Sequence, residues 1–129
     1  SDKRSPRHRL TARDRPGVLG RMKVVSAQVS CCGHTLTPRI LRLPGGQLVV
    51  NPGSVGCPAY LDTRVEPPFM HETGAPDARY AIIEDRNGMW SAALHAVPYD
   101  SRDMASLARA RGAESWAQAV ETGWINSPV

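Results

Sequence analysis

The residues of this sequence best suited to chemistry lie between Cys32 and Arg39, where Gly33 and His34 follow a run of small and β-branched side chains. A neutral imidazole at the end of a strand is a common ligand of Zn, Mn or Fe, and a glycine beside it lets a metal ion or substrate approach the backbone. A single histidine in such a place is more often a polar residue that caps the strand. Residue type alone therefore leaves both interpretations open.

The elements around this stretch can be read from the apolar pattern. Residues 24–32 are small, β-branched and nearly uncharged, which predicts a strand buried on both faces, although periodicity alone does not exclude a buried helix. Residues 39–43 alternate polar and apolar side chains, and 47–50 form the return strand of a hairpin across a Pro-Gly-Gly turn. The tetrapeptide Asn51-Pro52-Gly53-Ser54 then ends that strand.

A long loop and a second hairpin are expected next. Residues 56–78 contain four prolines and show no steady alternation, so we expect an irregular loop there. Residues 80–84 and 89–97 read as paired strands, because the Asn87-Gly88 dipeptide between them is typical of a type I′ turn.

Two helices are expected at the end of the chain, over 102–111 and 113–122, the first of them capped by Ser101. The apolar residues expected to gather on one face are Met104, Leu107 and Ala108 in the first helix and Trp116, Ala119 and Val120 in the second. Together with the strands, this predicts a sheet-rich α/β (α+β) piece. No strand–helix–strand unit with a substantial crossover helix is present, which argues against a complete doubly wound fold.

Composition limits the classes of protein to consider. The chain has 129 residues, 41% of them hydrophobic and 22% charged, which fits one folded domain. No apolar run approaches the roughly 20 residues that span a bilayer. Residues 1–25 hold eight of the 16 Lys and Arg, so we expect 1–23 to be a flexible basic leader and 24–129 to be the domain. Three cysteines make no disulfide framework, which favours the cytoplasm.

The order of the motifs resembles a known family. The motifs that carry the similarity are, in order, Gly33-His34-Thr35, Pro38, a hairpin with a Pro-Gly-Gly turn, and Asn51-Pro52-Gly53-Ser54-Val55-Gly56. The chain is similar here to the C-terminal part of calcineurin-like metallophosphoesterases. The small bacterial and archaeal phosphodiesterase branch is the nearest. The resemblance covers residues 28–99, and the helical pair that follows is similar to the end of such proteins.

The resemblance implies a four-layer α-β-β-α sandwich with two metal ions, usually Mn, Fe, Zn or Ni. In the family these ions bind the phosphate oxygens and activate a bridging hydroxide. His34 falls on a metal ligand of the family motif, whereas Leu36 stands where the family has its second histidine. An extended course would project both side chains to the same side. Arg39 is a weaker candidate for phosphate contact, and the Asn51–Ser54 turn would pack behind the metal site.

Other residues with chemical potential have simpler interpretations. The family's remaining ligands belong to an N-terminal half whose motifs do not occur in this sequence. We expect His71 to lie exposed in the proline-rich loop and His95 to be a packing or surface residue on a strand. Adjacent Cys31 and Cys32 would point to opposite faces of a strand, and Cys57 has no histidine base near it in sequence.

The functional expectation is the C-terminal portion of a metal-dependent phosphodiesterase, inactive alone, whose partner is a phosphoester substrate. One alternative is a non-catalytic relic or interaction module of the same fold, which Leu36 favours. A weaker one, a basic-tailed nucleic-acid binder, rests on the leader alone. Without a covering sheet, self-association is expected through an apolar face that contains Ile40, Leu41, Val49, Val50, Ile82 and Leu94.

Overall fold

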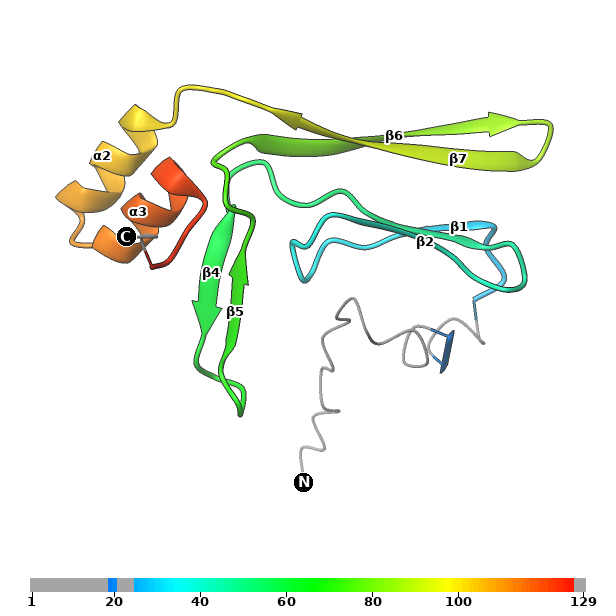
Figure 1. The fold of residues 1–129 in the computed structure, drawn as a ribbon, viewed down its shortest axis with the longest axis horizontal. Helices are drawn as coiled ribbons and strands as arrows, with labels where there is room; N and C mark the ends of the chain where they lie inside the picture. Colours follow the sequence, from blue (N-terminus) through cyan, green and yellow to red (C-terminus); the bar gives the residue numbers. More distant parts are fainter. Residues whose placement is uncertain (1–18, 21–24, 127–129) are drawn as a thin grey trace.

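The computed structural model describes residues 19–20 and 25–126, so most of the predicted basic leader lies outside the described residues. Within them the chain is a mixed α+β structure with small sheets and two helices (Figure 1). The strands are β1 (Val29–Cys31), β2 (Arg39–Arg42), β3 (Leu48–Asn51), β4 (Ala59–Asp62), β5 (Phe69–Glu72), β6 (Ala78–Arg86) and β7 (Met89–Val97). The helices are α2 (Arg102–Ala110) and α3 (Glu114–Thr122).

The first sheet has the order β1-β3-β2, with β1 parallel and β2 antiparallel to the central β3. The hairpin predicted over 39–50 is therefore confirmed. The expectation of a strand over 24–32 buried on both faces is wrong, because β1 has only three residues and Cys31 and Cys32 are exposed. The reason is its position at the edge of the sheet, where it pairs on one side only.

A further hairpin replaces the long loop expected over 56–78. β4 and β5 pair antiparallel, with Ala59 opposite Glu72 and Asp62 opposite Phe69. The prolines mark the ends of these strands rather than an irregular loop: Pro58 precedes β4, and Pro67 and Pro68 precede β5. Each strand has four residues, which is too short for alternation to stand out in the sequence.

The second predicted hairpin is confirmed and is longer than expected. β6 and β7 pair over nine residues each, from Ala78 opposite Val97 to Arg86 opposite Met89. Asn87 and Gly88 have φ values of 55° and 79°, as a type I′ turn requires. The Asp85 carboxylate accepts a hydrogen bond from the Gly88 backbone N–H at 2.7 Å and closes the turn.

Both helices lie close to their predicted bounds; α2 packs on α3, and α3 lies beside β4 (Figure 1). Ser101 occupies the capping position of α2, but its side chain makes no capping bond; the Asp100 carboxylate accepts from the Arg102 N–H instead. No helix in the described part of the chain has the length and apolar character needed to cross a bilayer.

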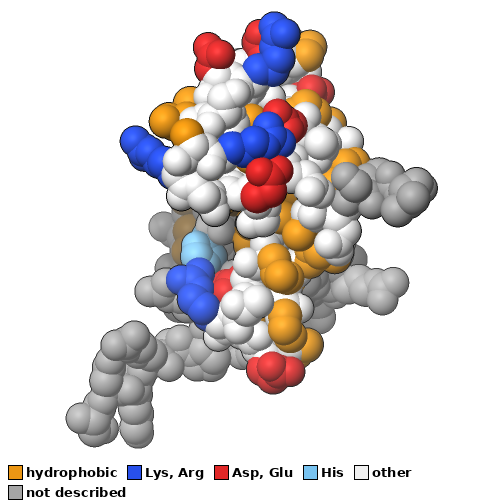
Figure 2. All heavy atoms as spheres, turned by 90° about the vertical axis from the view of Figure 1, so that its left-hand side faces the viewer, with side chains coloured by type: hydrophobic (Ala, Val, Ile, Leu, Met, Phe, Trp, Pro, Cys, Tyr) orange, Lys and Arg blue, Asp and Glu red, His pale blue; other side chains and the backbone are white. Residues whose placement is uncertain are grey.

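The helix faces differ from the prediction in the large side chains. Met104, Leu107 and Trp116 are exposed, and the contact between α2 and α3 is made by the alanines Ala105, Ala108 and Ala117. Small side chains let the two helices lie close together. On the outer side Arg109 binds the carboxylates of Glu114 and Glu121, and Figure 2 shows acidic and basic side chains interspersed over this end of the molecule.

The sheet core is small and leaves apolar side chains in water. Leu43 and Val49 are buried with Leu41 and Leu19 packed against them, and Leu48 and Val50 are the largest fully buried side chains. Val49 and Val50 therefore do not belong to an open face, contrary to expectation. Ile40, Ile82 and Leu94 are exposed, by 38%, 46% and 36%. Leu94 lies opposite Ala81 and so faces the other side of the hairpin from Ile82, which means that the expected single face is wrong for this pair. Tyr80 and Ile82 share the outer face of β6 because they are two residues apart in a strand.

We expect this exposed face to cause self-association. The double variant Tyr80→Thr, Ile82→Thr removes apolar surface while keeping strand propensity, so it should sediment as a smaller species than the natural chain at tens of micromolar. Sedimentation velocity over a concentration series measures the difference. Thr substitution of Met104 and Leu107, which are equally exposed on α2, is the matched control. A natural chain that stays monomeric throughout would contradict the expectation.

Candidate functional site

The turn that carries His34 starts directly after β1. Residues 33–36 form a β-turn closed by a hydrogen bond from the Leu36 N–H to the Gly33 carbonyl at 3.1 Å. His34 is exposed on this turn. The extended course considered for residues 34 and 36 is therefore wrong, because Leu36 has a left-handed backbone with φ of 57°. Leucine rarely adopts this conformation, whereas Asn, Asp and His adopt it more readily.

Asn51 ties this turn to the one that follows β3. Because β1 and β3 are parallel, their carboxyl ends meet at the same edge of the sheet. The buried Asn51 side chain donates from Nδ2 to Thr35 Oγ1 at 3.0 Å, and its Oδ1 accepts from the Gly53 N–H at 3.1 Å. A single amide thus fixes the position of both motifs that the sequence singled out.

Gly53 and Ser54 hold the second turn against the rest of the fold. Gly53 has φ of 93°, and a β-carbon there would lie 2.9 Å from Pro38 Cγ and 3.1 Å from Arg79 Cβ. The Ser54 hydroxyl accepts from the Cys57 N–H, and the Ser54 carbonyl accepts from the Arg79 N–H at 3.0 Å. Any larger residue at position 53 would displace Pro38 or Arg79, so the turn requires glycine.

The β4–β5 hairpin supports the His34 turn through two threonines. The Tyr60 hydroxyl donates to the Thr35 carbonyl at 3.2 Å, and the Thr37 hydroxyl donates to the same carbonyl at 3.3 Å. His71 Nδ1 lies 3.3 Å from Thr37 Oγ1. These contacts join residues far apart in sequence, and motif reasoning did not predict them.

His71 is not the exposed loop residue that the sequence predicted. It lies on β5, is buried with 7% exposure, and its ring packs 5.4 Å from that of Tyr60 on the paired strand. Burial lowers the pKa of His71, and the nearby Arg79 charge lowers it further; Glu72 and the Leu36 carbonyl act in the opposite direction. Recognition of the β4–β5 pairing would have placed His71 beside Tyr60. His95 is a packing residue on β7, stacked on Tyr80 with ring centres 4.8 Å apart.

Arg39 begins β2 opposite Asn51. Its Nη1 is buried and has no hydrogen-bond partner among the described residues. A buried guanidinium nitrogen is normally paired, so this one is available to an acceptor such as a phosphate oxygen.

The described residues do not by themselves fit a two-metal centre. They contain no group of three or more His, Cys, Asp or Glu side chains placed to hold a metal ion. His34 can supply one nitrogen ligand, and Leu36 supplies none. Cys31, Cys32 and Cys57 are free thiols. Partial desolvation raises the pKa of Cys57 and, together with the neighbouring Cys31, that of the surface residue Cys32, which favours the protonated form of both.

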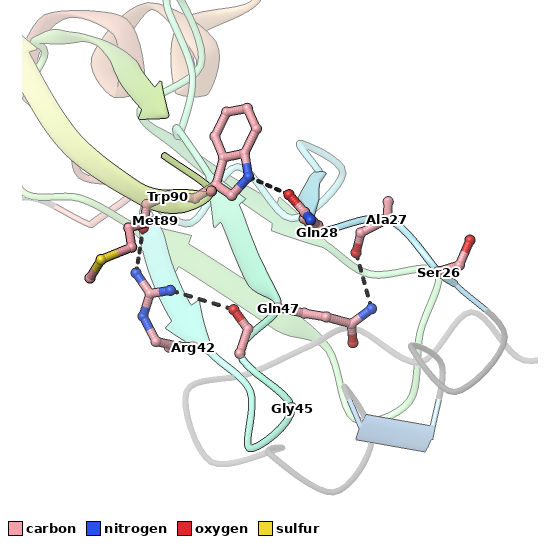
Figure 3. Close-up of a pocket in the computed structure, with 10 residues that line it drawn as sticks. Ser26, Ala27, Gln28, Arg42, Gly45, Gln47, Met89 and Trp90 are labelled. Carbon is pink, nitrogen blue, oxygen red and sulfur yellow. Dashed lines mark hydrogen bonds between the residues drawn. The ribbon is translucent and has the colours of Figure 1, made fainter. Parts of the chain in front are cut away.

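A separate cavity of about 650 Å³ lies between the turns of the β2–β3 and β6–β7 hairpins (Figure 3). Its polar side chains bond to the protein: Arg42 donates to the Trp90 carbonyl at 2.7 Å, Gln47 donates to the Ala27 carbonyl at 3.0 Å and Trp90 Nε1 donates to Gln28 Oε1 at 2.7 Å. These bonds hold the segment before β1 against both hairpins.

Comparisons of the chain with protein-family models, with curated proteins and with solved structures found no match.

Replacement of Asn51 tests the link between the turns. We expect Asn51→Leu to lower the free energy of unfolding by about 2 kcal/mol, because it leaves the partly buried Gly53 N–H and Thr35 hydroxyl without this partner. Chemical denaturation measures the loss. Gln28→Leu removes the exposed hydrogen bond that Trp90 Nε1 donates to Gln28 Oε1, and it should cost less than about 1 kcal/mol. Equal losses in the free energy of unfolding for the two variants would contradict the role of Asn51 in joining the two turns.

Backbone strain at Leu36 gives a second prediction. Leu36→Gly should be more stable than Leu36→Ala by about 1 kcal/mol, since both lose the side chain but only glycine adopts positive φ without cost. The same pair at exposed Glu84 on β6 should show the opposite order. Thermal and urea unfolding of the four variants measure both differences. An alanine variant at 36 as stable as the glycine variant would contradict the strained geometry.

Proposed function

We propose that the chain is the C-terminal portion of a calcineurin-like metallophosphoesterase that acts on phosphodiesters, with its remaining metal ligands supplied by an N-terminal half. The observation that carries the proposal is the meeting of Gly33-His34 and Asn51-Pro52-Gly53-Ser54 at the carboxyl ends of the parallel strands β1 and β3. Ligands of α/β sheets bind at such edges. The motif order that resembles the family is thus accompanied by closeness in space.

Each residue at this edge has a distinct part in the proposal. His34 donates one imidazole nitrogen to a metal ion, and Arg39 offers its unpartnered Nη1 to a phosphate oxygen. Asn51 and Thr35 are positioning residues that hold the His34 turn. When bound, the metal ions supply a polarised phosphate and an activated water. The described donors do not complete the centre, so we assign no step of the reaction to this chain alone.

In the same proposal, the exposed apolar face of β6 is the surface that the N-terminal half would cover. In a four-layer α-β-β-α sandwich, each sheet buries one face against the other sheet. Tyr80 and Ile82, which share one face of β6, would then contact a sheet contributed by the N-terminal half. The exposure of these side chains supports an incomplete layer structure, in which water now meets surface that the second sheet would cover.

Leu36 favours the alternative of a non-catalytic module. It stands where the family has a second histidine, and it gives the site an apolar side chain in place of a donor. Its left-handed backbone is better suited to histidine than to leucine. Strained residues concentrate at functional positions, so the conformation supports an origin in a working enzyme even where the side chain has changed.

An activity assay on the completed domain tests the proposal. The chain alone should hydrolyse a nitrophenyl phosphodiester in Mn²⁺ no faster than a protein-free control. Co-expression with the N-terminal half of a related phosphodiesterase should give Mn²⁺-dependent turnover. Leu36→His should raise that turnover by about tenfold or more, because it restores a donor to the metal centre.

Two variants control this assay. His34→Ala in the completed domain should abolish the Mn²⁺-dependent turnover, whereas His95→Ala, which removes an imidazole stacked on Tyr80, should retain it. Turnover that survives His34→Ala would refute the role of His34. Turnover absent from both the natural Leu36 form and the Leu36→His variant would favour the non-catalytic module.

A further inference from the structure

Three buried side-chain nitrogen atoms lack a hydrogen-bond partner among the described residues, and all three belong to basic side chains: Arg39 Nη1, His71 Nε2 and Arg79 Nε. Buried polar atoms in folded proteins are almost always paired. We propose that His71 and Arg79 form an oxyanion site that takes the phosphate group of a ligand beside residues 35–38. This site goes beyond the proposed phosphoesterase centre, since it needs neither His34 nor a metal ion.

His71 is held by one nitrogen and presents the other. The Thr37 hydroxyl donates to the Thr35 carbonyl, so Thr37 Oγ1 is free to accept from His71 Nδ1 at 3.3 Å. The Tyr60 ring packs against the imidazole and limits its rotation. Nε2 is then the nitrogen left without a partner among the described residues. In a protonated ring it donates a hydrogen bond to an oxyanion, and the proton is taken from solvent or from the phosphate itself.

Arg79 is fixed beside the same segment. Its N–H donates to the Ser54 carbonyl at 3.0 Å, and its Cβ and Cδ both lie against Gly53, which adjoins Pro38. The absence of a side chain at Gly53 is what allows the arginine stem to lie there. Nε is buried without a partner at the end of this stem. His71 contacts Thr37, and Arg79 lies against Gly53 beside Pro38, so the two side chains flank the same short segment.

The charge balance selects an anion. Glu72 is the carboxylate that acts on His71, and its Oε2 already accepts from the backbone N–H groups of Ile125 and Asn126 at 2.8 and 3.4 Å. A cation at His71 Nε2 would be repelled by Arg79. A phosphate group has several acceptor oxygens and the negative charge to offset both side chains.

A phosphate titration of the full chain, without metal, tests the site. The ring resonances of His71 in a chain labelled with ¹⁵N-histidine are followed by NMR at constant ionic strength. We expect a saturable shift with millimolar inorganic phosphate and an increase in the pKa of His71. The ring of His95 should not respond. Acetate, added in a parallel titration, tells a phosphate ligand from a carboxylate.

Variants of Arg79 and Arg86 distinguish phosphate binding by Arg79 from the effect of one positive charge anywhere on the protein. Arg79→Met should weaken phosphate binding about tenfold or more, and Arg79→Lys, which keeps the charge and much of the stem, should weaken it less. Arg86→Met removes the same charge from an exposed position on β6 and should leave the affinity unchanged. No saturation, acetate binding as tight as phosphate binding, or an Arg79→Met affinity equal to that of Arg86→Met would overturn the proposal.

Discussion

The parallel pairing of β1 with β3 is the constraint on which the candidate site depends. It brings the turn after each strand to one edge of the sheet, where the Asn51 amide bonds to Thr35 on one side and to Gly53 on the other. These bonds are partly buried, and the Asn51 side chain that makes both is buried, so their loss costs free energy. The geometry of His34, the conformation of Leu36 and the packing of Pro38 on Gly53 all follow from this junction.

The fold around this junction is stabilised more by polar contacts and alanine packing than by a large apolar core. Leu48 and Val50 are the largest fully buried side chains, and the helix pair meets through alanines. Small domains bury a low fraction of their surface and are marginally stable. The exposed Tyr80 and Ile82 on β6 and the unpartnered basic nitrogens are therefore features that a larger assembly or a ligand can satisfy.

Local sequence patterns predicted most of the strands and helices, whereas the contacts of the candidate site depend on strand pairing between distant residues, which the sequence did not reveal. Asn87-Gly88 and the alternation around them were enough to find the β6–β7 hairpin, because type I′ turns have strict residue requirements. The four-residue strands β4 and β5 were missed between prolines, and His71 was misplaced with them. The turn at Leu36 was missed because leucine gives no signal for positive φ. The functional expectation from the family resemblance stays a proposal, since the comparisons found no match.

The claim that His34 is a metal ligand is tested most directly by anomalous scattering. Crystals of the chain completed by an N-terminal half would be soaked in Zn²⁺ and measured on both sides of the zinc absorption edge. Our account predicts an anomalous peak about 2.0–2.1 Å from a ring nitrogen of His34, the usual zinc–imidazole distance. Bound zinc with no peak near the His34 ring would contradict it.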